Sequence, residues 1–277
     1  MIATAVIMAA GKGTRFGDRT ADMPKGFIEF KGKSMIERSI ENLIGTGITR
    51  IIIGTGYHHE WYDKLAKKYP QIQTVFSKNY ASTNSMETLS VCREAIGDED
   101  FLLLESDIIY EPKALTALIN DNHPDIMLVT PVTKFQDQYY IAADEGHYLE
   151  GCDTDKYKLI ERFIDDPYGE LVGIHKISNE FYKDMLKAYE YKIRWSEHFH
   201  NNENPRKRGY EFYLEDVATW HPIAAKCIRP EDPLPTYPSG GLSDARPLYV
   251  LKQDNLQWYE IDDEKDLYYA ESHIKIY

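Results

Sequence analysis

Strand-like and helix-like segments alternate along the first 130 residues, and this alternation limits the fold more than any other feature of the sequence. Short runs of β-branched and apolar residues predict strands at 3–8, 48–53, 72–76, 101–105 and 126–130. Amphipathic segments between them predict helices at 34–44, 61–69, 84–96 and 112–119. Strands joined by helices form parallel sheets. We therefore expect an α/β fold: a Rossmann-like, mostly parallel sheet with helices on both faces.

The second half of the chain follows a different pattern. Short segments bounded by turn residues predict antiparallel strands at 139–143, 148–152, 157–160 and 171–177, which form a smaller extension of the sheet. Helices at 179–191, 213–220 and 263–274 and strands at 224–228 and 248–251 complete the prediction. The proline-rich segment 229–247 has the composition of a loop, and a lid, a subunit contact and an inert surface excursion all fit it.

Composition narrows the class of protein. The 277 residues are 43 % hydrophobic and 13 % aromatic, which excludes a disordered chain. The 32 basic and 45 acidic residues give a net charge of −13, which disfavours nucleic-acid and anionic membrane partners. The apolar N-terminus has no preceding basic residue, and no apolar run approaches the roughly 20 residues of a membrane helix. The three cysteines are widely spaced and odd in number, which suits a reducing compartment better than a disulfide scaffold. The sequence therefore predicts a cytoplasmic protein without membrane insertion.

A glycine-rich loop, Gly11–Gly17, follows the first predicted strand, in the place where nucleotide phosphates bind. A dinucleotide fingerprint requires a small residue at position 16, where Phe16 stands. A P-loop that ends at Ser34 would require glycine at position 27, where Phe27 stands. Both interpretations fail. Taken alone, the glycines also fit an ordinary turn between a strand and a helix.

The wider pattern resembles the nucleotidyltransferase family that makes nucleotide-activated sugars and alcohols. The resemblance rests on Ala9-Ala10-Gly11-x-Gly13-Thr14-Arg15, followed by Met23-Pro24-Lys25. Glycines allow backbone N–H groups to approach triphosphate oxygens, and basic side chains supply the opposite charge. The resemblance implies that Arg15 and Lys25 are catalytic. It also implies that the nucleotide contacts Ala9, Ala10, Gly11, Gly13, Thr14 and Arg15.

Acidic residues near two predicted strands suggest a metal site. Asp107 follows a buried strand, where a carboxylate needs a partner or a metal, although it could instead cap a helix. Glu105 is expected to face the other way. Glu260 and Asp262 share one face of an extended segment, where a solvated acidic face is the alternative. The resemblance implies that Asp262 is the second metal carboxylate, so we expect Asp107, Asp262 and Glu260 to hold Mg²⁺.

The segment 79–89 is placed by the resemblance at the base and ribose of the nucleotide. Asn84 and Ser85 are the candidate binding residues there, and Ser106 is assigned to the same nucleotide site. Asn84 also stands three residues before Glu87, which is the spacing of a helix cap. Capping and nucleotide binding are compatible roles for this segment.

Several stretches together narrow the resemblance to a branch of the family that contains phosphocholine and 2-aminoethylphosphonate cytidylyltransferases. They are residues 23–29, 51–57, 80–89, 101–107 and 170–174. They look closer to the phosphonate members. This resemblance implies that the chain transfers CMP from CTP to 2-aminoethylphosphonate and releases pyrophosphate, which activates a head group in phosphonate metabolism. The alternatives are a phosphocholine cytidylyltransferase, a sugar-1-phosphate nucleotidyltransferase that uses UTP or dTTP, and a catalytically silent nucleotide sensor.

The acceptor of such a reaction would be a small phosphonate or phosphate. Candidate acceptor-binding residues are Lys25, Asp144, Glu170 and Tyr139. Because Gly11 and Asp262 must meet, we expect a single domain over 1–277. It divides into a nucleotide-binding core at 1–130, an acceptor-binding extension and insertion at 131–247, and a returning segment with the last helix at 248–277. A homodimer is left open.

Overall fold

Strand β1 (Thr4–Ala9) lies inside the main sheet and is buried on both faces. The computed structural model describes residues 2–134, 138–163, 165–198, 209–219 and 246–276. Ala5 and Ile7 pack in the core on one side of the sheet, whereas Val6 and Met8 pack in the core on the other. Two buried faces explain why every residue of this strand is apolar or small.

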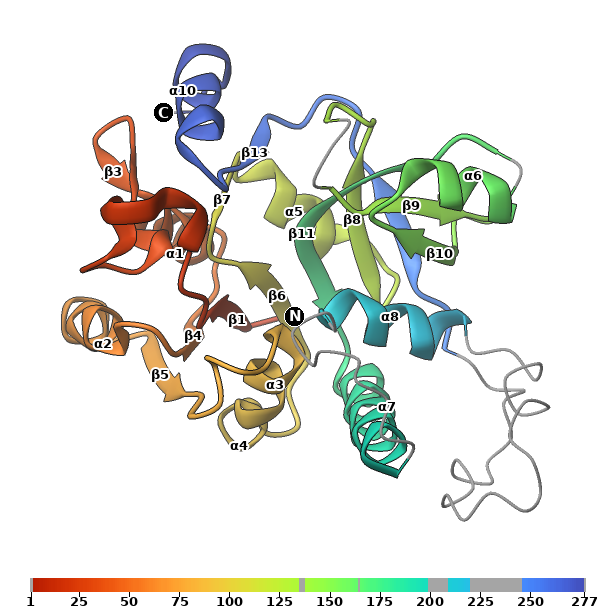
Figure 1. The fold of residues 1–277 in the computed structure, drawn as a ribbon, viewed down its shortest axis with the longest axis horizontal. Helices are drawn as coiled ribbons and strands as arrows, with labels where there is room; N and C mark the ends of the chain where they lie inside the picture. The colour runs from red at the N-terminus through yellow and green to blue at the C-terminus, as the bar shows by residue number, and fades with distance from the viewer. Residues whose placement is uncertain (1, 135–137, 164, 199–208, 220–245, 277) are drawn as a thin grey trace.

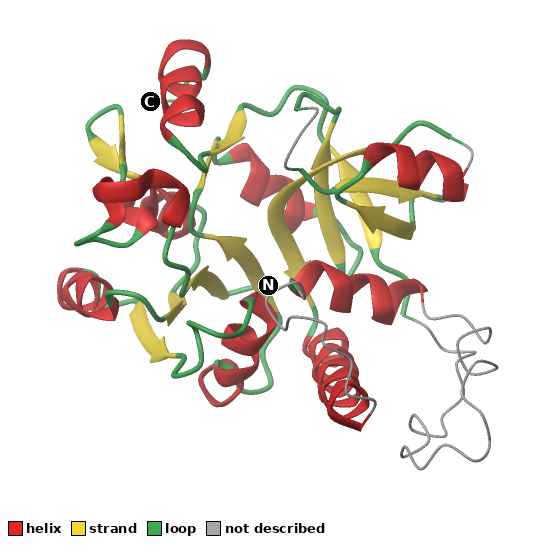
Figure 2. Ribbon diagram, viewed as in Figure 1, coloured by secondary structure: helices red, strands yellow, loops and turns green. Residues whose placement is uncertain are grey.

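The parallel part of the sheet confirms the predicted α/β fold. It runs in the order β6 (Phe101–Glu105), β1, β4 (Arg50–Thr55) and β5 (Ile72–Phe76). Helices cover both faces, as Figure 2 shows. One face carries α1 (Met35–Gly45), α2 (His59–Lys68) and α5 (Lys113–Asn120). The other carries α3 (Ser85–Val91), α4 (Arg93–Ile96), α7 (Asn179–His198) and α8 (Tyr210–Thr219).

The predicted antiparallel extension continues the same sheet. β11 (Gly169–Ile177) pairs antiparallel with β6, β8 (Ile126–Thr130) and β9 (Tyr140–Ala143), and β9 pairs with β10 (Leu149–Asp153). β12 (Tyr249–Lys252) pairs parallel with β8. A short hairpin joins β2 (Glu29–Phe30) and β3 (Lys33–Ser34).

The end of the chain returns beside the N-terminal half. β13 (Trp258–Glu260) pairs antiparallel with β7 (Ile108–Tyr110), directly after the turn that follows β6 (Figure 1). This pairing brings the last strand to the edge of the sheet where β1 and β6 end. Helix α10 (Glu264–His273) follows, and Asp263 caps it as predicted by accepting hydrogen bonds from two backbone N–H groups.

Some local predictions are wrong. Residues 157–160 lie in helix α6 (Lys156–Phe163) rather than in a strand, because Leu159 and Phe163, four residues apart, pack together against β9. The 3-10 helix η1 (Thr14–Thr20) begins inside the glycine loop, and a second one, η2 (Lys25–Phe27), follows it. The helix predicted at 84–96 is interrupted at Cys92. The strand predicted at 224–228 and most of the proline-rich segment lie outside the described residues.

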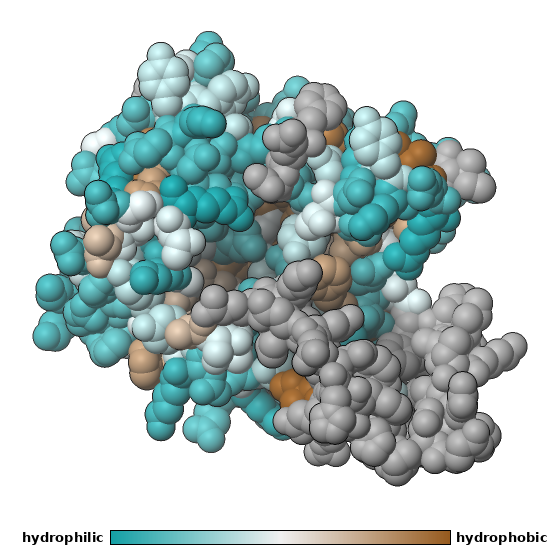
Figure 3. Space-filling model, viewed as in Figure 1, coloured by the Kyte–Doolittle hydropathy of each residue, from teal (hydrophilic) through white to brown (hydrophobic). Residues whose placement is uncertain are grey.

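The face of the molecule drawn in Figure 3 is mostly hydrophilic. None of the described helices has both the length and the apolar character that a membrane crossing requires.

Candidate active site

Two adjoining cavities lie at the edge of the sheet where β1 and β6 end. The larger has a volume of about 790 Å³, and the glycine loop lines it together with Tyr57 and the residues around Asn84. The smaller has a volume of about 400 Å³ and lies toward β11 and α8. The residues that line both cavities are Arg15, Glu105, Tyr139, Glu211 and Asp262. The carboxyl end of parallel strands is the usual ligand-binding edge of such a sheet.

The glycine loop closes over Lys25. Gly13 has a left-handed backbone with φ of 62°, and a Cβ at this position would lie 2.8 Å from the Cβ of Lys25. The hydroxyl of Thr20 donates a hydrogen bond to the Gly13 carbonyl at 2.9 Å. Only glycine therefore allows this conformation and this close approach. The turn places residues 10–15 along the larger cavity.

Lys25 connects two of the predicted metal ligands. Its Nζ lies 2.6 Å from Oδ2 of Asp107 and 2.5 Å from Oδ1 of Asp262. Arg15 contacts the other oxygen of Asp262 at 2.6 Å. Lys25 is 9 % exposed, and although burial alone would lower its pKa, the Asp107, Asp262 and Glu260 carboxylates raise it above the ordinary value. Arg15, Lys25, Asp107 and Asp262 thus meet at one site, as the sequence predicts.

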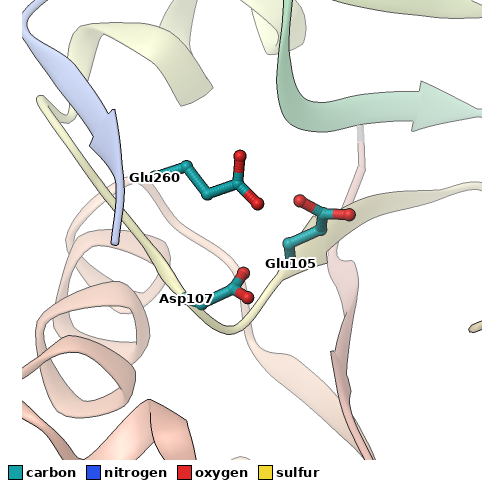
Figure 4. A group of neighbouring side chains, drawn as sticks. All are labelled: Glu105, Asp107 and Glu260. Carbon is teal, nitrogen blue, oxygen red and sulfur yellow. The ribbon is translucent and has the colours of Figure 1, made fainter. Parts of the chain in front are cut away.

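Two further carboxylates, those of Glu105 and Glu260, lie close to Asp107. Glu105, Asp107 and Glu260 each offer an oxygen within 4.8 Å of the others, and Figure 4 shows their side chains directed into a common space. The prediction that Glu105 faces away is therefore wrong. Strand alternation would itself place two residues that are two apart on one face, and in the structure Asp107 lies in the bend after β6, which turns its side chain toward Glu105. Burial and the nearby Asp262 and Asp107 carboxylates raise the pKa of Glu260 to about 8.

This donor set fits a divalent cation. Carboxylate oxygens are hard ligands, and they bind magnesium better than the sulfur of cysteine or the nitrogen of histidine does. Glu260 is held by Gln138, whose side-chain N–H group donates to it at 3.1 Å. The raised pKa of Glu260 and of Glu105 has the same physical origin, since several buried carboxylates lie close together without equal positive charge.

All but one of the residues predicted to bind the nucleotide line the larger cavity. Its lining includes Ala10, Gly11, Gly13, Thr14, Asn84, Ser85 and Ser106. Ala9 is not among the described residues that line it, because it is the last residue of β1 and its side chain packs in the core. Asn84 caps α3 by accepting from the backbone N–H of Ser85 at 2.8 Å. The hydroxyl of Ser85 accepts from the backbone N–H of Tyr210, which joins α3 to the start of α8.

The residues predicted to bind the acceptor substrate fall into two groups. Lys25 and Tyr139 line a cavity, whereas Glu170 and Asp144 are not among the described lining residues. The Glu170 carboxylate accepts from the backbone N–H groups of Thr133 and Lys134, so it fixes that loop. Asp144 accepts from the backbone N–H of Tyr148 in the turn between β9 and β10. Both carboxylates are used by local structure.

The sequence prediction missed Glu211. It lies in the first turn of α8, is 4 % exposed and lines both cavities. A signal was present, because Glu211 stands in the aromatic run Tyr210-Glu-Phe-Tyr-Leu214, where a charged residue is rarely buried without a reason. Gln138 and Thr154, which line the smaller cavity, had no comparable signal.

Comparison with known proteins places this site in a family. The model of the nucleotidyl transferase family matches residues 4–144, just over half of the chain. A CTP:phosphoglutamine cytidylyltransferase of Campylobacter jejuni is 25 % identical over 202 residues, which are 67 % of this chain and 77 % of that protein. A 2-aminoethylphosphonate cytidylyltransferase of Lancefieldella rimae is 31 % identical over 105 residues, 38 % of this chain and 43 % of that one.

A solved structure extends the likeness in fold to the whole chain. The structure of a CTP:phosphocholine cytidylyltransferase from Streptococcus pneumoniae has a TM-score of 0.66 and 19 % identity, and the match covers 98 % of this chain and 99 % of that one. The resemblance seen in the sequence is thus confirmed: the chain belongs to the nucleotidyl transferase family.

Proposed function

We propose that this protein transfers CMP from CTP to 2-aminoethylphosphonate and releases pyrophosphate, with Mg²⁺ as its metal. One observation carries the proposal: Arg15 and Asp262 line both cavities, and Lys25 and Asp107 join them in one charged group. A nucleotide in the larger cavity and an acceptor in the smaller would approach each other at this group. The similarity to cytidylyltransferases favours CTP over other nucleotides.

The reaction needs no general base from the protein. A phosphonate oxygen is already ionised at neutral pH, so it forms a bond to the α-phosphorus while the bond to the pyrophosphate oxygen breaks. The pair of electrons in that bond leaves with pyrophosphate. Catalysis then depends on positioning and on neutralising charge.

Each basic residue has an assigned task. Lys25, which lines the larger cavity and pairs with Asp262, neutralises the α-phosphate or the acceptor anion, and Arg15 neutralises the β- and γ-phosphates. The residues that would hold Mg²⁺ are Asp107 and Asp262, with Glu260 beside them. When bound, the metal supplies positive charge to the triphosphate. Lys25 must then exchange its carboxylate partners for phosphate oxygens.

The proposal requires a single catalytic domain, because Arg15 and Asp262 come from opposite ends of the chain and touch. The proposed location is the cytoplasm. Cys92 and Cys152 are free and buried, which suits a reducing compartment.

A pyrophosphate-release assay with panels of nucleotides and acceptors tests the proposal. The expected result is turnover that requires CTP, 2-aminoethylphosphonate and Mg²⁺ together. If the enzyme prefers phosphocholine, the proposed acceptor is wrong and phosphocholine takes its place. If it prefers UTP or dTTP with a sugar 1-phosphate, the protein is a sugar-1-phosphate nucleotidyltransferase instead. Absence of pyrophosphate with every pair would favour a nucleotide sensor.

Asp107→Asn tests the metal assignment. The variant should lose turnover while its thermal unfolding stays close to that of the wild type. Asp98→Asn, which changes an exposed aspartate paired with Lys183, is the control. Activity of Asp107→Asn within about tenfold of the wild type, ~1.4 kcal/mol of barrier, would remove Asp107 from the metal site.

A further inference from the structure

The acidic wall of the smaller cavity contains one residue, Glu211, that the candidate metal group does not account for. Glu211 lines this cavity together with Glu105 and Glu260. Glu211 stands on α8, and it is not part of the Glu105–Asp107–Glu260 group that could hold a metal. Its carboxylate is buried and needs a source of positive charge of its own.

Glu211 lacks a basic partner in the described part of the chain. Asp107 and Asp262 each pair with Lys25, but no lysine, arginine or histidine of the described residues lies within 4.0 Å of the Glu105 or Glu211 carboxylate. The Glu211 and Glu105 carboxyl groups are both buried and lie near enough for each to affect the pKa of the other. Glu105 accepts a hydrogen bond from the hydroxyl of Tyr210 at 3.1 Å. Two buried carboxyl groups near each other, without a basic side chain, form a place where a cation is favoured.

The backbone leaves room for these two carboxylates. Gly173 lies in β11 where the pairing with β8 shifts register, with φ of 78°, and a Cβ there would come within 2.7 Å of Oε2 of Glu105. A Cβ on Gly209 would overlap Oε2 of Glu211. Glycine at both positions therefore allows the pair to face the cavity. The pair is built into the fold rather than left on its surface.

We propose that Glu211, together with Glu105, binds the primary ammonium group of the acceptor and selects it over a quaternary one. This inference rests on the proposed function. A primary ammonium offers three N–H donors to carboxylates, whereas a trimethylated nitrogen offers none and requires aromatic faces. Tyr139 is the one aromatic side chain among the described residues that line this cavity.

The charges around the cavity also fit such an acceptor. Arg15 and Glu211 both line it, and Lys25, which the proposed function assigns to the acceptor anion, shares Asp262 with Arg15. An acceptor with an anion at one end and an ammonium at the other would satisfy both. Helix α8 supports this role, because Glu211 is in its first turn, where the helix dipole stabilises a carboxylate.

Glu211→Gln tests the inference, with Glu215→Gln as the matched control. Glu215 lies one turn further along α8 and pairs with Arg162. The acceptors are 2-aminoethylphosphonate, ethylphosphonate, which lacks the amine, and the N-trimethyl analogue of 2-aminoethylphosphonate. The wild type should prefer the primary amine to both analogues in kcat/KM. Glu211→Gln should reduce this preference at least tenfold, about 1.4 kcal/mol, mainly through KM. Glu215→Gln should keep it.

Direct binding separates this inference from the proposed function. Calorimetric titration with 2-aminoethylphosphonate and ethylphosphonate, in the presence of CTP analogue and Mg²⁺, measures the same preference without turnover. The amine should bind at least tenfold more tightly to the wild type, and Glu211→Asp, which keeps the charge, should retain part of that difference. Equal affinities, or a Glu211→Gln variant that folds and keeps the full preference, would overturn the inference. Failure of turnover alone, with the binding preference intact, would instead refute the proposed reaction.

Discussion

The charge network around Lys25 makes a quantitative prediction about stability. In the protein without metal, Lys25→Met removes the ammonium that lies 2.6 Å from Asp107 and 2.5 Å from Asp262 but keeps most of the aliphatic stem. Removing one partner of a buried ion pair costs about 3–5 kcal/mol. The cost here should be about 2–4 kcal/mol, because the two carboxylates are 22 % and 14 % exposed and Asp262 keeps Arg15.

A divalent cation should reverse most of this loss. With Lys25 absent, Asp107 and Asp262 are free to bind metal, and a ligand at 100 times its Kd stabilises the folded state by about 2.7 kcal/mol. Urea unfolding of both proteins, with chelator and then with saturating Mg²⁺, measures the two effects. We expect Mg²⁺ to stabilise Lys25→Met more than it stabilises the wild type, in which the metal must displace Lys25.

Lys113→Met provides the control, because Lys113 forms an ion pair with Glu111 on the surface and its side chain is 47 % exposed. That change should cost no more than about 1 kcal/mol and should not respond to Mg²⁺. The reasoning is refuted if Lys25→Met is as stable as the wild type in chelator, or if Mg²⁺ stabilises both proteins equally.

Three further predictions follow from buried groups and backbone geometry. Burial raises the pKa of Glu211 from 4.5 to about 7. The free energy of unfolding that the neutral carboxyl group contributes is therefore complete below pH 4.5 and is lost as the pH rises through 7. In urea unfolding, Glu211→Gln should lack about 3 kcal/mol of this loss of stability. Burial lowers the pKa of His175 from 6.5 to about 3, and neither ring nitrogen has a partner among the described residues. Stability that is present above pH 6.5 is therefore lost on acidification, and the wild type should lose about 2 kcal/mol between pH 7 and pH 5 that His175→Leu does not lose. Equal slopes of unfolding free energy against pH for both proteins would contradict this. Gly13→Ala should lower pyrophosphate release at least tenfold, because the new Cβ would displace Lys25. The control is Gly17→Ala: Gly17 also has a positive φ, 55°, but open space around it, so this variant should lose only about 1–2 kcal/mol of stability. Similar activities of the two variants would show that the contact with Lys25 is unimportant.

Local patterns in the sequence determined much of this protein. The strands at 72–76, 101–105 and 126–130 were predicted with the bounds that the structure has. The strands at 101–105 and 126–130 are almost wholly buried, and a strand buried on both faces is apolar along most of its length and is bounded by turn residues. The caps at Ser34 and Asp263 follow from side chains that bond to backbone groups two or three residues away. The glycine loop, Lys25, Asp107 and Asp262 could be named as site residues because each belongs to a recognisable short motif.

Only the tertiary structure decided what these residues contact. Lys25 meets Asp107 and Asp262 across 82 and 237 positions of sequence, through pairing of β13 with β7 that no short motif encodes. Glu170 fixes a loop, whereas Glu211 lines the smaller cavity, and these different uses of two buried carboxylates depend on the register of β11 and the position of α8. A sequence records which groups carry charge, but the partner that offsets each charge is set by packing between distant elements.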